Sequence, residues 1–320
     1  MASQPRTSTV SSKSSKATLK PHFIPQSPFD DTDADAILTS SDGVDFRVYR
    51  VILSLLSPIF KDLFRLPQPP GSPQVPSIHM AENAVTLDRV LRFCYPGAEL
   101  NPQPTLDQLR QILEICLLKY DMQSMIPTAK KYVTAFATTN PIAVFAIACC
   151  HEWKDIASVS ARNSLQLPIR SFDSRTVIKE LEFIPASHYD RLLRYHATCS
   201  AVCVAATQTL EWLDSTQQTW FTCRNPKCIP TQSFRCIADR EVCYARNWFV
   251  SYMKEVRKTL KVRPAARVDD PALMVDALIG MVKCSTCRGD GFEELQWFAT
   301  ISLASRIATV LEKVKLDLPF

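Results

Sequence analysis

The chain has 320 residues, a formal net charge of +5, 46% hydrophobic residues and only 6 glycines. This length supports two or three domains, and the low glycine content favours helices over glycine-rich turns. The sequence has no run of eighteen or more apolar residues, and its N-terminus lacks the apolar core of a secretory signal. We therefore expect an intracellular protein of the nucleus or cytoplasm that does not enter membranes. Its 12 cysteines should be reduced, buried or metal-bound, not disulfide-paired.

The first 28 residues are rich in Ser, Thr and Pro, and the only charged residues before position 21 are basic. Such a segment buries too little apolar surface to offset the entropy lost on ordering. We expect a disordered tail over residues 1–28. A targeting or phosphorylation segment is the alternative interpretation.

A turn signal, Ser41-Asp42-Gly43, separates two short β-prone runs at residues 34–38 and 44–50. Gly43 can adopt the positive φ that hairpin turns require. The pattern predicts a β-hairpin.

The next motif, Ser57-Pro58, predicts a break between two helices. Proline suits the first turn of a helix, and the serine hydroxyl can cap that helix. The apolar residues that follow recur at helical spacing and would line one face of the second helix: Ile59, Phe60, Leu63 and Phe64. Core packing is the simplest interpretation of the two phenylalanines.

Further motifs follow in order: a short strand at residues 77–80, a helix ending in Phe93-Cys94-Tyr95-Pro96-Gly97, and an amphipathic helix from Leu106. Together with the hairpin and the Ser-Pro step, they resemble a BTB/POZ domain, which we place at residues 29–137. The resemblance implies an α+β fold in which a small sheet is combined with helical hairpins. It also implies protein-protein interaction as the function.

The resemblance bears on partners as well. Many dimeric BTB domains exchange a helix and strand that precede the first motif, but residues 22–28 are short and broken by proline. Homo-oligomerisation through the BTB domain is therefore an alternative that we expect not to use this exchange element. The BTB adaptors that bind cullins commonly carry a hydrophobic residue, any residue and then Glu in the loop after the Ser-Pro-x-Phe helix. The matching loop here, Leu66-Pro67-Gln68-Pro69-Pro70, lacks that glutamate, which counts against a cullin partner.

The remainder should be mainly α-helical. We expect a helical extension over residues 138–215 and a helical, cysteine-bearing region over residues 216–320. Proline positions and apolar spacing predict helices at four places: residues 141–153, 156–165, 174–181 and 187–213. The run from Arg191 to Cys199, with the later cysteines, is similar to BTB proteins of mushroom-forming fungi. That resemblance implies partner binding and supplies no established activity.

Two close cysteine pairs are the sharpest chemical feature: Cys223-Arg-Asn-Pro-Lys-Cys228 and Cys284-Ser-Thr-Cys287. Each short spacing lets two sulfurs face one ion, and four thiolates complete the tetrahedral shell of zinc. The pattern predicts a structural zinc site formed by Cys223, Cys228, Cys284 and Cys287. Four reduced, buried thiols are the alternative.

Other cysteines give weaker patterns. His196 and Cys199, three residues apart on a predicted helix, could supply alternative ligands, but a hydrogen-bonded core histidine beside a buried cysteine is the better interpretation. Cys236 and Cys243 have no convincing spacing partner. We interpret them as structural or incidental.

Basic residues concentrate between positions 224 and 267, where the only acidic residues are Asp239, Glu241 and Glu255. On the predicted helix 248–261, one face is apolar and the adjacent face is basic. The basic face comprises Lys254, Arg257, Lys258 and Lys261. It would suit a phosphate backbone or an acidic protein, and a solvated charged face is the alternative.

Motifs for catalysis are missing from the sequence, which has no G-x-S-x-G elbow, phosphate-binding glycine loop, dinucleotide fingerprint or H-E-x-x-H helix. His151-Glu152 beside Cys149-Cys150 do not converge on one substrate atom, because neighbours on a helix point in different directions. We expect no enzyme and no catalytic residues. The leading hypothesis is a BTB scaffold or adaptor, with a cullin-type ubiquitin ligase adaptor as its most specific form. The alternative is a nuclear chromatin- or nucleic-acid-associated regulator.

Overall fold

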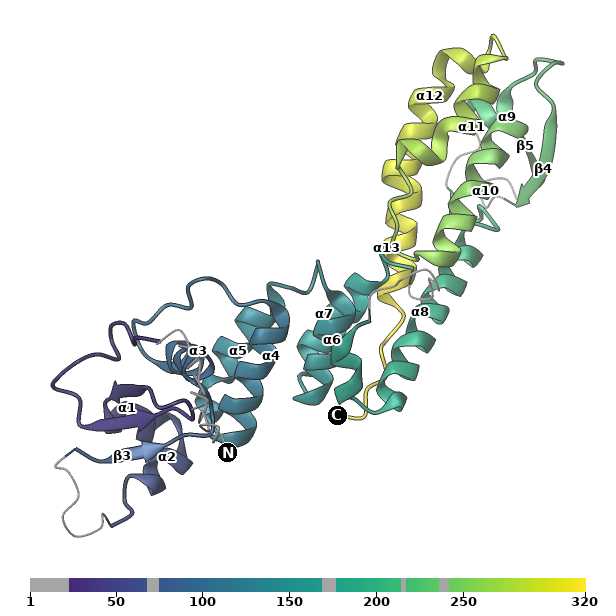
Figure 1. Cartoon of the computed structure of the whole chain (residues 1–320). Helices are drawn as coiled ribbons and strands as arrows, with labels where there is room; N and C mark the ends of the chain where they lie inside the picture. The colour runs from purple at the N-terminus through teal and green to yellow at the C-terminus, as the bar shows by residue number, and fades with distance from the viewer. Residues whose placement is uncertain (1–22, 68–74, 169–176, 214–216, 236–241) are drawn as a thin grey trace, which may run out of the picture. The chain divides into compact units, whose positions relative to one another are not determined.

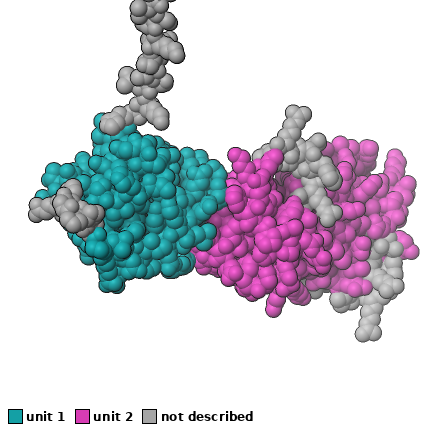
Figure 2. Space-filling view, turned by 60° about the horizontal axis from the view of Figure 1, so that its bottom comes forward, with its two compact units in different colours: residues 1–127 teal, residues 128–320 magenta. Residues whose placement is uncertain are grey.

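The computed structural model describes residues 23–67, 75–168, 177–213, 217–235 and 242–320. The chain forms two compact units, Met1–Pro127 and Thr128–Phe320, which Figure 2 colours separately. We call them the N-terminal unit and the C-terminal unit. The predicted tail lies, up to residue 22, outside the described residues.

The N-terminal unit contains a three-stranded mixed sheet in the order β2-β1-β3. Strands β1 (Ala36–Thr39) and β2 (Asp45–Val48) are antiparallel, and β3 (Ser77–His79) is parallel to β1. Gly43 in the connecting turn has a φ of +81°, which an L side chain rarely adopts. The predicted hairpin is confirmed.

Ser57 separates helix α1 (Arg50–Leu56) from helix α2 (Pro58–Leu63). Its hydroxyl oxygen accepts a hydrogen bond from the Phe60 N–H and its hydroxyl donates to the Tyr120 carbonyl. The predicted cap and helix break are confirmed. The predicted apolar face is wrong at Ile59, which is 38% exposed, because the short helix buries Phe60 as its main core residue.

Helices lie beside the three-stranded sheet in the N-terminal unit (Figure 1). They are α3 (Ala84–Cys94), α4 (Leu106–Leu113), the π-helix η1 (Glu114–Lys119) and the 3-10 helix η2 (Gln123–Met125). Helix α5 (Ile126–Thr134) begins at the end of this unit and continues into the C-terminal unit. The Tyr95 hydroxyl accepts a hydrogen bond from the Tyr49 N–H, so the Phe-x-Tyr-x-Gly motif fixes the entry to α1. This α+β arrangement, followed by a mostly helical region, confirms the predicted fold class.

After α5, the C-terminal unit continues with four helical elements. They are α6 (Pro141–Cys150), α7 (Lys154–Ser164), the 3-10 helix η3 (Lys179–Phe183) and α8 (Ala186–Ala206). Of these, α6 and α8 are shorter than the sequence predicts and α7 is one residue longer. Of the helix predicted at 174–181, residues 174–176 lie outside the described residues, and regular structure begins only at Lys179. The helix predicted to reach Leu213 ends at Ala206 because Leu210 and Leu213 enter the core from a non-helical segment.

The later elements of the C-terminal unit pack around the two long helices α8 and α10 (Asn247–Val262). The other later elements are α9 (Thr219–Thr222), β4 (Pro230–Arg235), β5 (Val242–Arg246), α11 (Pro271–Val282), α12 (Cys287–Trp297), the π-helix η4 (Phe298–Leu303) and α13 (Ala304–Glu312). Helix α8 packs against α10 and α13, and α11 packs against α10 (Figure 1). The antiparallel hairpin β4–β5 is a feature that the sequence analysis missed.

An aromatic cluster forms the core of this region. Trp220 stacks on Phe249 with ring centroids 4.6 Å apart, and Phe298 meets Trp220 edge-on at 5.5 Å. All three side chains are fully buried. The same core extends from Cys203 to Ile307, so it crosses the predicted boundary between residues 215 and 216.

Candidate metal centre

The four cysteines of the predicted zinc site come together in the C-terminal unit. Cys223 follows α9 and Cys228 precedes β4, while Cys284 follows α11 and Cys287 opens α12. All four are buried, and their sulfurs lie within 4.8 Å of one another. The cluster therefore joins the α9–β4 connection to the α11–α12 connection, about sixty residues later in the sequence.

The sulfur separations are too long for disulfide bonds and are compatible with a metal site. Cys223 Sγ lies 3.7 Å from Cys284 Sγ, and Cys228 Sγ lies 3.7 Å from Cys287 Sγ. A disulfide requires about 2.05 Å. Four sulfurs at about 2.3 Å from a tetrahedral zinc ion lie about 3.8 Å apart. The observed separations therefore fit zinc, with each short distance joining one cysteine from each pair.

The connection from Cys284 to Cys287 favours a thiolate at Cys284. Burial by itself raises the pKa of this thiol, but hydrogen bonds outweigh that effect and lower the pKa to about 7. The donors are the backbone N–H groups of Cys287 and Thr286 and the thiols of Cys287 and Cys223. Backbone N–H groups directed at a sulfur stabilise its anionic form, which is the form that binds a metal.

Burial is the main influence on the pKa values of two further thiols, Cys228 and Cys287. Burial raises the pKa of Cys228 to about 11, and burial raises the pKa of Cys287 further still. The indole N–H of Trp248 opposes the shift at Cys287, and this buried group has no conventional hydrogen-bond acceptor among the described residues. Uncharged thiols at these depths are stable, and a bound cation would favour their ionised forms.

Neighbouring polar groups hold the first cysteine pair in place. The Asn225 carbonyl accepts a hydrogen bond from the Cys228 N–H, and its side-chain oxygen accepts one from the Lys227 N–H. The Arg246 guanidinium donates to the Cys228 carbonyl at 2.8 Å, which ties β5 to the cluster. The Asn225-Pro226 turn signal could have been found in the sequence, whereas Trp248 and Arg246 are placed by tertiary packing.

The donor set decides what a metal could do here. Four thiolates fill a tetrahedral shell, so no position remains for a water molecule or a substrate. A zinc ion in this site would be structural.

The predicted basic face changes in the structure. Lys254, Lys258 and Lys261 are exposed along one side of α10, but Arg257 is half-buried and donates two hydrogen bonds to the Thr207 carbonyl. Burial lowers the pKa of Arg257. The structure therefore removes Arg257 from the solvent-facing set, because its guanidinium ties the end of α8 to α10.

The weaker metal candidates lie elsewhere. His196 is buried, its Nε2 lies 3.2 Å from the Leu167 carbonyl, and burial lowers its pKa. The interpretation of His196 as a hydrogen-bonded core residue is confirmed. Burial raises the pKa of Cys199 to about 11, as expected for a structural thiol. Cys236 lies outside the described residues, and Cys243 is half-buried in β5.

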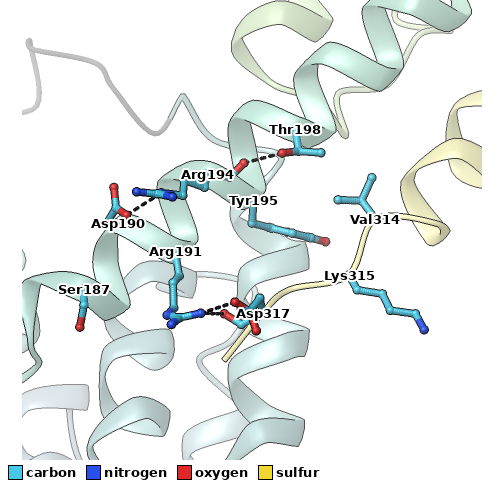
Figure 3. A pocket seen from close by; sticks show the side chains of 9 residues that line it. All are labelled: Ser187, Asp190, Arg191, Arg194, Tyr195, Thr198, Val314, Lys315 and Asp317. Carbon is cyan, nitrogen blue, oxygen red and sulfur yellow. Dashed lines mark hydrogen bonds and ion pairs between the residues drawn. The ribbon is translucent and has the colours of Figure 1, made fainter. Parts of the chain in front are cut away.

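A separate hollow of about 430 Å³ lies between α8 and the extended C-terminal segment (Figure 3). Arg194 pairs with Asp190, and Arg191 pairs with Asp317. These ion pairs neutralise the two arginines that line the hollow. The Arg191–Asp317 pair therefore links α8 to the C-terminal segment that contains Asp317.

Comparison with protein families identifies the N-terminal part of the chain. Residues 27–136 match the family model of the BTB/POZ domain, which is about a third of the chain. The chain thus contains a BTB/POZ domain, a module that binds proteins and is typically non-catalytic. Comparison with curated proteins finds no match. The similarity of the later region to BTB proteins of mushroom-forming fungi stays a prediction. None of the helices in the described residues has the length and apolar character needed to cross a membrane.

Proposed function

We propose that this protein is a non-enzymatic scaffold or adaptor that recruits one partner through its BTB/POZ domain and another through its C-terminal unit. The BTB/POZ match over residues 27–136 is the observation that supports this function. A separate C-terminal unit with its own core provides a second surface in the same chain. The predicted divisions at residues 29–137, 138–215 and 216–320 are part of this proposal, with one core shared by the last two regions.

The most specific form of the proposal is a substrate adaptor for a cullin-based ubiquitin ligase. The loop that would carry the expected glutamate begins at Leu66, and its residues from Gln68 to Pro70 lie outside the described residues. Affinity purification of the tagged full-length chain from its own cells tests this form, with a chain lacking residues 29–137 as control. A cullin and its RING partner, recovered only with the full-length chain, would support an adaptor. Recovery of other partners without a cullin would exclude the ligase form.

The second part of the proposal is a structural zinc ion at Cys223, Cys228, Cys284 and Cys287. Four buried sulfurs within 4.8 Å of one another support it, since two of their separations are 3.7 Å. Elemental analysis of the purified chain should find one zinc per molecule, and Cys284→Ser should remove it. The exposed Cys150 provides the control, because Cys150→Ser should leave the zinc content unchanged. A metal-free chain with four reactive thiols would contradict the proposal.

A nucleic-acid-associated regulator is the second candidate function. The exposed lysines at positions 254, 258 and 261 support it, because they are spaced to lie along one side of α10. Such a stripe would contact phosphates with an affinity that falls steeply as salt rises. Fluorescence anisotropy with a labelled duplex, comparing the wild type with a Lys254→Glu, Lys258→Glu, Lys261→Glu triple variant, tests this. An absence of binding by the wild type at low salt would exclude this function.

A further inference from the structure

Trp248 carries a buried indole N–H that no oxygen or nitrogen atom accepts. The side chain is 3% exposed, and its Nε1 has no conventional hydrogen-bond partner in the part of the chain that the structure describes. A buried donor without an acceptor costs free energy, so such groups are rare in folded proteins. Burial raises the pKa of the Cys287 thiol, and this indole N–H opposes the rise. The donor is therefore directed at the sulfur cluster.

Close packing between α10 and α11 fixes the position of Trp248. The indole meets the Trp220 ring edge-on, with ring centroids 6.0 Å apart. On α11, a Cβ added at Gly280 would lie 2.9 Å from the Trp248 Cβ. Glycine is unfavourable in the interior of a helix, and at this position it lets the two helices approach at Trp248. The indole N–H therefore has little freedom to turn away from the sulfurs.

The charge of a loaded site explains why such a donor would be needed. Zinc with four thiolates is an anionic centre, because the four negative ligands outnumber the two positive charges of the ion. N–H groups directed at a buried anion stabilise it, and partners outside the ligand shell hold the ligands in place. Cys284 interacts with the backbone N–H groups of Cys287 and Thr286. The N–H group that acts on the Cys287 sulfur is the indole of Trp248.

We propose that Trp248 donates its indole N–H to the Cys287 thiolate of the metal-loaded site and thereby raises the metal affinity of the four cysteines. The inference rests on the structural zinc ion proposed above. Trp248 is a positioning residue, because it acts on a ligand and not on the metal. Arg246, two residues earlier, donates to the Cys228 carbonyl at 2.8 Å. The start of α10 thus holds one ligand from each cysteine pair.

Titration of the metal-free full-length chain with cobalt(II) tests the proposal, because the thiolate-to-cobalt absorption band reports on the sulfur ligands. Trp248→Phe should lower the cobalt affinity by about 10–100-fold. The same variant should move the band to lower energy, since a thiolate that loses a hydrogen bond gives up an electron more readily. Competition with zinc(II) should show a matching loss of zinc affinity.

Trp220→Phe is the matched control. Trp220 is fully buried in the same aromatic cluster, and its Nε1 also lacks a conventional partner among the described residues. It is not among the main influences on Cys228, Cys284 or Cys287, so this variant should leave the band in place. Benzothienylalanine at position 248 keeps the shape of the indole without its N–H. It should reproduce the band shift even if Trp248→Phe loosens the core.

The outcomes separate this inference from the proposed zinc site. A wild type that takes up neither cobalt(II) nor zinc(II) would refute the metal site and the role of Trp248 with it. If the wild type binds one metal ion but both changes at position 248 leave the wild-type band in place, Trp248 serves packing alone. The inference then fails while the zinc site stands.

Discussion

The N-terminal unit fixes its helices with a buried carboxylate, whereas the C-terminal unit brings four buried sulfurs together. In the N-terminal unit Glu82 accepts hydrogen bonds from the Tyr120 hydroxyl and the Lys119 ammonium group. These three residues connect the segment before α3 to the end of η1. Every partner is supplied by the chain, so this network is complete without a ligand.

The sulfur cluster of the C-terminal unit differs from this network because all four of its side chains are thiols. Four thiols can exchange only weak hydrogen bonds with one another, and a bound cation would satisfy all four at once. The stability of the C-terminal unit should therefore depend on metal, whereas that of the N-terminal unit should not. All five tryptophans, from Trp153 to Trp297, lie in the C-terminal unit, so their fluorescence reports its unfolding alone.

Loss of a metal ligand should have the largest effect. Cys284→Ser should remove a substantial part of the roughly 10 kcal/mol that structural zinc can contribute, and a strong zinc chelator should act similarly on the wild type. Tryptophan fluorescence during thermal unfolding measures the loss. Cys94 and Cys116 are buried in the N-terminal unit, so their reaction with a thiol reagent reports the unfolding of that unit. The midpoint of this labelling transition should stay unchanged. An unchanged fluorescence midpoint would contradict metal dependence.

Removing a core ring of the N-terminal unit should have the second-largest effect. It should destabilise the N-terminal unit and leave the C-terminal unit unchanged. Phe60 is fully buried and stacks on Tyr120 with ring centroids 4.7 Å apart, so Phe60→Ala should cost about 3–5 kcal/mol. The thermal midpoint measured by Cys94 labelling should fall, and the thermal midpoint measured by tryptophan fluorescence should stay unchanged. Leu55→Ala, at a residue 79% exposed, is the control and should cost less than about 0.5 kcal/mol. Equal losses in the two variants would argue against this core.

The carboxylate network should show a smaller, coupled effect. Glu82→Gln and Tyr120→Phe should each destabilise the N-terminal unit by about 1–3 kcal/mol, because each leaves a buried polar group without its partner. The double variant should cost less than the sum of the single costs. Denaturant unfolding followed by Cys94 labelling measures all three variants. Simple additivity would show that the two side chains do not interact.

The smallest effect should be a pH dependence of the C-terminal unit. Because burial lowers the pKa of His196, the unfolded chain binds a proton near its ordinary pKa of about 6.5 while the folded unit stays neutral. Stability should therefore fall below about pH 6.5, at up to about 1.4 kcal/mol per pH unit. His196→Gln should flatten this slope in fluorescence-monitored unfolding. His79→Gln, at an exposed residue of β3, should leave it unchanged.

Local patterns were enough to predict the N-terminal unit. The turn at Gly43, the cap at Ser57 and the helix before Tyr95 depend on neighbours in the sequence, and the structure confirms them. The error at Ile59 arose because helical spacing identifies a face but does not show how much of that face a partner covers.

The sequence by itself determined the BTB/POZ motifs, the two cysteine pairs and the apolar face of α10, because each depends on short-range spacing. Only the tertiary structure decided that Cys223 would meet Cys284, that Trp248 would cover Cys287, and that Arg257 would turn inward to the Thr207 carbonyl. These contacts join residues far apart in the chain, and their geometry follows from how helices pack around the Trp220 cluster. Spacing along the chain predicted that the two cysteine pairs meet, but it does not give the distances within the cluster, the side chains around it or the direction in which Arg257 points.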